Sequence, residues 1–246
     1  MRLGGFFLIT AAVIAVCPAF ALDERRVVSP DGQVEFRLFV GSQPESSLSR
    51  VAYQLRYRGQ LLIDTSYLGF DLYTWEPMLG ENVGLISETH SDHAIKARFM
   101  QNGSLARLLD VEVRAFNDGV AFRCTIGKST GVERLQIADE TTEFDLPHAP
   151  GTPLTLPFVA EEKGVGWVAI SEVPVPGLPR MGLAEEDFAG KKILLSRLTR
   201  KQVYPDVVYD GKPPLTLPWR VITIAPTREL VMQLAAERQA SLASQP

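Results

Sequence analysis

Apolar and polar residues alternate with a period of two through much of this 246-residue chain, and this pattern limits the possible folds most. Successive side chains of a strand point to opposite faces, so alternation marks a strand with one buried face. The pattern recurs at short intervals, without helical periodicity between the runs, over residues 34–40, 51–57, 109–115 and 120–126. It therefore favours an all-β antiparallel sandwich over βαβ units.

Two turns and one helix complete this outline. Arg58-Gly59-Gln60 and Asn117-Asp118-Gly119 separate alternating runs, and Asp-Gly in such a place is a strong hairpin signal because glycine accepts a positive φ. Pro226 and Thr227 can start a helix over residues 226–243. We expect its apolar stripe to pack on the sandwich, and the stripe consists of Leu230, Val231, Leu234 and Ala235.

The N-terminus reads as a secretory signal peptide over residues 1–21. Arg2 supplies a positive charge, Phe6–Val16 is apolar, and Ala19-Phe20-Ala21 fits a small-x-small cleavage site. The sequence therefore predicts an exported protein, periplasmic or secreted, with no membrane segment after cleavage. Residues 22–246 then form one domain, since all-β domains of this length are common.

Composition excludes some classes of function. The formal net charge is −4, and no long basic run or basic-aromatic array occurs, so nucleic acid is not an expected partner. Cleavage would leave Cys124 as the one cysteine, which excludes an internal disulfide. Cys124 lies in an apolar run, which favours a buried, inert thiol over a nucleophile.

Several short motifs, taken together in their order, resemble the N-terminal domain of glycoside hydrolase family 97. They are Ser29-Pro30-Asp31-Gly32, Tyr67-Leu68-Gly69-Phe70, residues 117–123, Thr152-Pro153-Leu154-Thr155, Ile170-Ser171-Glu172 and Pro218-Trp219-Arg220-Val221-Ile222. The resemblance implies an antiparallel two-sheet supersandwich of the galactose-mutarotase-like type. In that family a catalytic (β/α)8 barrel follows, so this chain resembles the accessory domain without its barrel.

Glu172 is the sharpest candidate site residue. It ends the run Trp167–Glu172 on the face of Val168 and Ile170, and a buried carboxylate usually meets a cation, a donor or the edge of a cleft. The alternative is a glutamate that simply reaches water at the strand end. The resemblance implies that the matching glutamate helps to bind calcium at a domain interface. Calcium prefers 6–8 oxygen ligands, so we expect a weak and incomplete site here and no required cofactor.

Two neighbouring aromatic residues are candidates for binding carbohydrate. Tyr73 and Trp75 lie where a strand gives way to a loop, and aromatic rings there can stack on sugars. Trp219 alternates with Val221 and is expected in the core instead.

The other polar clusters favour structural or solvent-exposed roles over metal binding or catalysis. His90 and His93 lie in a strand-like region that places them on opposite faces, and His148 is remote in sequence, which argues against zinc. The acidic residues Asp139, Glu140 and Glu143 are interpreted as a solvated turn rather than as a glycosidase pair.

These features lead to three hypotheses. The first is an exported, non-catalytic, carbohydrate-associated sandwich that binds a glycan or supports a separate barrel-bearing glycoside hydrolase. The second is a mutarotase-like sugar epimerase, which needs an acid and a base such as a histidine beside Glu172. The third is a protein-interaction scaffold that uses the face where a barrel would dock.

Overall fold

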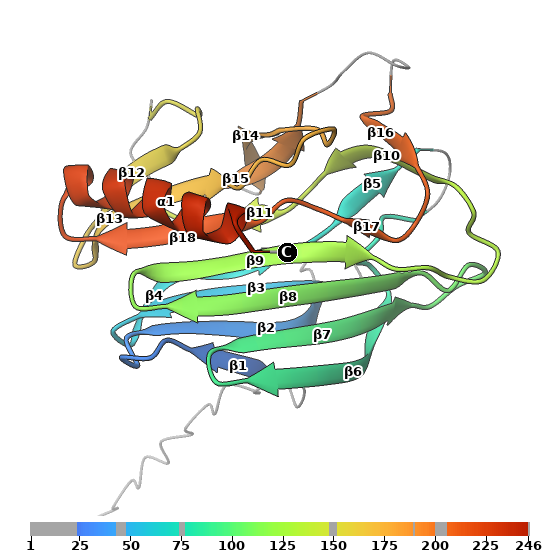
Figure 1. The fold of residues 1–246 in the computed structure, drawn as a ribbon, viewed down its shortest axis with the longest axis horizontal. Coiled ribbons are helices and arrows are strands. Elements are labelled where there is room, and N and C mark those ends of the chain that lie inside the picture. The colour runs from blue at the N-terminus through green and yellow to red at the C-terminus, as the bar shows by residue number, and fades with distance from the viewer. Residues whose placement is uncertain are drawn as a thin grey trace, which may run out of the picture.

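The computed structural model describes residues 24–42, 48–73, 77–147, 152–188, 190–199 and 206–245. Over these residues the chain is an all-β antiparallel sandwich with one C-terminal helix, as the alternation predicts (Figure 1). The predicted signal peptide, Trp75 and His148 lie outside the described residues.

One layer contains a four-stranded and a three-stranded sheet. The first has the order β1 (Arg25–Val28), β2 (Val34–Ser42), β3 (Ser49–Tyr57) and β4 (Gln60–Tyr67). The second has the order β16 (Tyr209–Gly211), β10 (Leu135–Glu140) and β5 (Phe70–Leu72). All their pairings are antiparallel.

The facing layer is one large sheet. Its order is β12 (Phe158–Glu162), β13 (Gly166–Glu172), β18 (Arg220–Ala225), β9 (Gly119–Ile126), β8 (Leu108–Phe116), β7 (Ala94–Gln101) and β6 (Val83–Ser91), and β17 (Leu215–Thr216) also pairs with β9. A small sheet of β11 (Glu143–Phe144), β15 (Lys191–Leu198) and β14 (Met181–Phe188) contacts β4 and β10 of the first layer.

The core fills the space between the layers. Phe36 and Tyr53 stack with ring centroids 5.1 Å apart, and Phe122 from the large sheet lies 5.3 Å from Tyr53. The predicted hairpin joins β8 to β9, and Gly119 has φ 147° there. A Cβ on Gly119 would lie 2.0 Å from the carbonyl oxygen of Ile222, so only glycine fits between the turn and β18.

The helix α1 (Arg228–Ala243) covers the outer face of β13 and β18 (Figure 1). Thr227 caps its start by accepting a hydrogen bond from Leu230 N. The predicted stripe is partly wrong: Val231 and Ala235 are buried, but Leu230 is 36% exposed and Leu242 takes part instead. Leu230 precedes Val231 by one residue and so points about 100° away around the helix.

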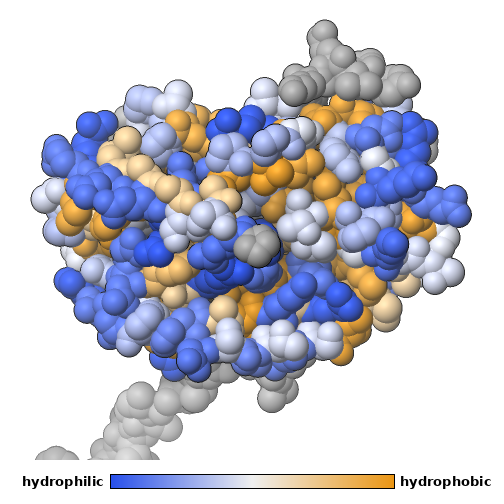
Figure 2. Space-filling view, viewed as in Figure 1, coloured by the Kyte–Doolittle hydropathy of each residue, from blue (hydrophilic) through white to orange (hydrophobic). Residues whose placement is uncertain are grey.

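Polar residues are spread over much of the face that α1 shares with the large sheet (Figure 2). Among the described residues, no helix combines the length and the apolar character needed to cross a membrane.

Candidate functional site

Arg220 joins two carboxylates inside the sandwich. Its Nη1 donates to Glu172 Oε2 at 3.0 Å, its Nε donates to Glu140 Oε1 at 3.0 Å, and its Nη2 also contacts Glu140 Oε2. All three side chains are at most 3% exposed. The pairing follows from strand register, because Glu172 on β13 lies opposite Arg220 on β18 and Glu140 ends β10 in the facing layer.

Glu172 has two further donors. Arg180 Nε donates to its Oε1, and the backbone N of Met181 donates to its Oε2 at 2.9 Å. The side chain of Glu172 is 1% exposed, so the alternative in which it simply reaches water is wrong. The predicted shared face is confirmed, since Val168 and Ile170 are fully buried beside it. Glu172 therefore ties the segment before β14 to the sandwich.

This arrangement does not fit a calcium ion. Both oxygens of Glu172 accept hydrogen bonds, and two guanidinium groups already balance the charges of Glu172 and Glu140. Calcium needs several oxygen ligands free of such donors. No group of three or more His, Cys, Asp or Glu side chains is arranged to hold a metal in the described parts of the chain. Glu172 acts here as an acceptor for arginines.

A second buried ion pair involves Glu143 on β11, three residues after Glu140. Arg50 Nη1 is 3.5 Å from Glu143 Oε1, the backbone N of Tyr67 donates to Glu143 Oε2 at 3.3 Å, and the Arg50 guanidinium lies 5.3 Å from the Tyr67 ring centroid. Burial raises the pKa of Glu143 to about 7, against the opposing effect of Arg50. Burial likewise lowers the pKa of Arg50.

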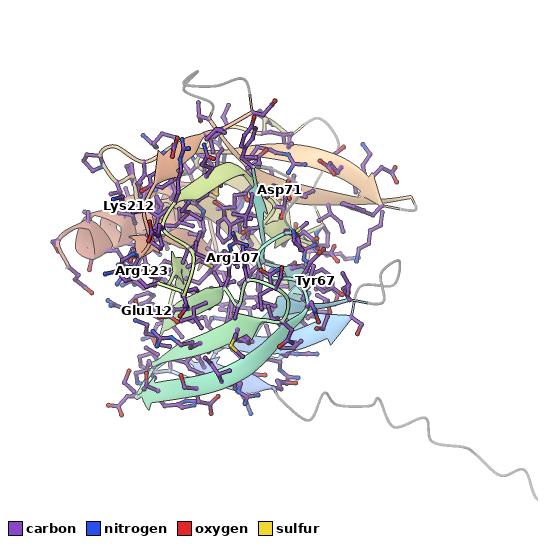
Figure 3. The ribbon with its side chains drawn as sticks, turned by 90° about the vertical axis from the view of Figure 1, so that its right-hand side faces the viewer. Tyr67, Asp71, Arg107, Glu112, Arg123 and Lys212 are labelled. Atoms are coloured by element: carbon purple, nitrogen blue, oxygen red, sulfur yellow. The ribbon has the colours of Figure 1, made fainter. Side chains whose placement is uncertain are left out.

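The solvated acidic turn predicted for residues 139–143 is therefore wrong. Glu140 and Glu143 are 2% and 5% exposed, and Asp139 Oδ1 accepts from the backbone N of Leu198 at 2.7 Å. The segment joins β10 to β11 beside β4, and Arg50 of β3 and Arg220 of β18 reach its carboxylates. Figure 3 shows Tyr67 and Asp71 on the side of the first layer, and Glu112 and Arg123 toward the outer face of the large sheet.

The predicted carbohydrate-binding pair is described only in part. Tyr73 follows β5, is 41% exposed, and its backbone N donates to Gln136 O at 3.0 Å. An exposed aromatic ring next to a strand end can stack on a sugar. Trp75 lies outside the described residues.

Trp219 is buried, as the alternation predicts, but on the outer face of the large sheet. It packs with Val173, Val221 and Leu242. The guanidinium groups of Arg114 and Arg123 lie 4.8 and 4.4 Å from its ring centroid. Cys124 is buried as expected, and burial raises the pKa of its thiol, so it remains protonated.

The two described histidines lie far from Glu172. His93 Nδ1 is 2.9 Å from Val28 O, and His90 Nε2 is 3.2 Å from Glu88 Oε1. His90 and Glu172 share one register row across the large sheet, through Ile95, Val113, Phe122 and Arg220. Five strand spacings separate them by about 24 Å. Neither histidine can act with Glu172 on one sugar.

Comparison with known proteins gives one matching family and several similar structures. The family described as Glycosyl-hydrolase 97 N-terminal matches residues 27–155. No curated protein matches.

This chain is similar to two structures of a glycoside hydrolase family 97 enzyme from Pseudoalteromonas sp. strain K8. For the E480Q variant of that enzyme in complex with panose, the sequence identity is 18% and the TM-score is 0.66. For the complex with acarbose, the sequence identity is 17% and the TM-score is 0.67. In both, 82% of this chain covers 36% of the enzyme. A β-arabinopyranosidase is 17% identical with TM-score 0.64, over 82% of this chain and 40% of the other. At these identities the similarity concerns the fold, and this chain spans well under half of each solved relative.

Proposed function

This chain belongs to the glycosyl-hydrolase 97 N-terminal family, and we propose from that membership that it is a non-catalytic, carbohydrate-associated β-sandwich. It binds a glycan or supports a separate glycoside hydrolase domain. The similar enzymes support the second role, because the matched part accounts for 36–40% of their length. Export to the periplasm or the exterior, directed by residues 1–21, would place the chain where polymeric glycans are found.

The observation that carries the proposal is the pairing of buried glutamates with arginines. Glu140 and Glu172 meet Arg220, and Glu143 meets Arg50. A glycosidase needs two carboxyl groups that face one sugar across about 5–9.5 Å of accessible space. Carboxylates held by guanidinium groups inside the sandwich serve packing and cannot reach a glycosidic bond. We therefore infer that these glutamates have a structural role.

Tyr73 is the residue through which we propose a first sugar contact. Its ring is exposed beside a strand end, and its backbone is fixed by Gln136. Trp75 would supply the neighbouring ring. A stacked sugar is held mainly by its apolar C–H face, so the interaction is weak and tolerant of sugar identity.

Calorimetric titration of the mature protein with panose and with maltotriose tests this role. We expect millimolar binding that Tyr73→Ala removes and Tyr73→Phe retains, since phenylalanine keeps the ring. Phe188→Ala is the matched control, because Phe188 is a similarly exposed aromatic residue on β14. Equal binding by the wild type and Tyr73→Ala would reject Tyr73 as the contact.

A further inference from the structure

A groove of about 510 Å3 lies at one end of the sandwich, away from Glu172 and Tyr73. It is bounded by the turn before β2, the β3–β4 turn, the β8–β9 turn and α1; the last two lie toward the left in Figure 1. Its volume is within the usual range for small-molecule sites. The proposed sugar contact at Tyr73 does not involve this groove.

Contacts between the turns hold the groove in shape. The backbone N of Asp31 donates to Asn117 Oδ1 at 3.0 Å. Arg238 of α1 forms an ion pair with Asp118 and lies 3.7 Å from the Phe116 ring centroid. These contacts join the helix and two turns that are far apart in sequence. A ligand would meet a surface that is already ordered, which lowers the entropic cost of binding.

Polar groups on one wall remain available to a ligand. Asp31 Oδ1 accepts from Ser29 Oγ and Gln33 N, and Arg58 Nε donates to Gln33 Oε1 at 2.6 Å. Asp31 Oδ2, Asn117 Nδ2 and the two Nη atoms of Arg58 have no hydrogen-bond partner among the described residues. The wall thus offers an acceptor, an amide donor and a pair of guanidinium donors side by side.

The remaining lining is apolar, and the charges balance. Apolar groups that are at least partly exposed also line the groove, on Pro30, Tyr57, Phe116, Pro226 and Leu234. Asp118 and Arg238 neutralise each other, which leaves one carboxylate, on Asp31, and one guanidinium, on Arg58. A strongly charged ligand would meet a like charge as well as an opposite one. A neutral ligand with hydroxyl groups and apolar C–H faces matches both the polar and the apolar lining.

We propose that this groove binds one or two rings of a neutral saccharide, with the hydroxyl groups of those rings on Asp31, Asn117 and Arg58. The inference rests on the proposed carbohydrate-associated role and adds a site separate from Tyr73. The Ser29 hydrogen bond lowers the pKa of Asp31, so this acceptor stays ionised at neutral pH. A carboxylate acceptor makes stronger hydrogen bonds to hydroxyl groups than a neutral acceptor does.

The test follows amide chemical shifts of the 15N-labelled mature protein during titration with panose. Asp31→Asn keeps the Oδ1 acceptor of the turn and removes the charge. Arg58→Asn removes the guanidinium at φ 51°, a conformation that asparagine tolerates. Asp210→Asn and Arg134→Asn are matched controls, because these residues form an exposed ion pair away from the groove. Tyr73→Ala separates the two proposed sugar sites.

We expect panose to shift the amides of residues 31–33, 57–59 and 117–119, with unchanged shifts in Tyr73→Ala. Each groove variant should weaken this binding about tenfold, as expected for loss of a charged hydrogen-bond partner, and the controls should not. Shifts confined to the Tyr73 region, and lost in Tyr73→Ala, would overturn the groove site while the proposed function stands. Absence of any shift would overturn the groove and sugar binding together. Tighter binding of glucose 6-phosphate than of panose would overturn the neutral class of ligand.

Discussion

Glu172 and Arg220 face each other as a register pair on β13 and β18, with Oε2 and Nη1 3.0 Å apart and both side chains almost completely buried. Glu140 approaches the same guanidinium from the other layer. The two sheets are therefore joined by charge as well as by apolar packing. This relationship predicts how the sandwich responds to loss of either partner.

Arg220→Met should destabilise the fold by about 3–5 kcal/mol, because it leaves the carboxylate of Glu140 buried without its cation. Chemical denaturation at pH 7 measures the change. Lys192→Ala is the control, because Lys192 on β15 and Glu185 on β14 form an exposed ion pair. Loss of this pair should leave the midpoint of chemical denaturation unchanged. A change below about 1 kcal/mol for Arg220→Met would show that the buried cluster is not needed for stability.

The pKa of Glu143 predicts a decline in stability with rising pH. The folded-state pKa of about 7 exceeds the ordinary value of 4.5, so the folded protein binds the proton more tightly than the unfolded chain does. The resulting stabilisation is present below pH 4.5 and is lost as the pH rises to about 7, by up to about 3 kcal/mol. Glu143→Gln should flatten this decline in denaturation curves recorded between pH 4.5 and 7.5.

Glu112→Gln serves as the control for that pH series. Burial raises the pKa of Glu112, but Arg114 and Arg123 together outweigh it and hold the pKa below its ordinary value, so the contribution of Glu112 to stability is present above pH 4.5 and is lost on acidification. The variant should therefore keep the decline that Glu143 causes. An unchanged slope in Glu143→Gln would assign the decline to another group.

The helix α1 should stabilise the sandwich through Val231 and not through Leu230. Val231 is fully buried against Ala169 and Ala225, whereas Leu230 is 36% exposed. Val231→Ala should cost roughly 1–3 kcal/mol, and Leu230→Ala less than about 0.5 kcal/mol. Thermal melts of both variants and of a chain ending at Pro226 check this. Equal melting temperatures for all four proteins would mean that α1 is a loose tail.

Calcium should bind weakly at Glu172, if it binds the isolated chain at all, because two arginines and the Met181 amide occupy the carboxylate. Calorimetric titration with calcium chloride should show no site with a micromolar dissociation constant. Millimolar calcium should leave the melting temperature of the protein unchanged. A micromolar site that Glu172→Gln abolishes would contradict this expectation. It would mean that the arginines move aside to admit the ion.

The strands were the most predictable part of the fold. Alternation identified the inward faces of β2, β8 and β9, and Asp118-Gly119 identified the hairpin, because both signals are local. The same reasoning misjudged Leu230, since which helical face is buried depends on the crossing position on β13 and β18. Helical spacing alone does not give that position.

The charged interior was less predictable. Sequence reasoning identified Glu172 as a carboxylate that needs a partner, but it did not find Arg220. A signal was present, because Arg220, Ile222 and Ile224 alternate on one face of an apolar strand. Glu140 and Glu143 were misjudged because their arginines come from residues 80 and 93 positions away. Ion pairs between residues so far apart in sequence can be identified only from the tertiary structure.

We propose that the paired glutamates serve structure, and we therefore expect this chain to cleave no glycosidic bond. The direct measurement is prolonged incubation of the purified mature protein with panose and with aryl α-glucosides and α-galactosides, followed by chromatography of the products. We expect no product above the buffer control, with or without calcium. Turnover that persists through purification and is abolished by Glu172→Gln, in a variant that remains folded, would contradict it.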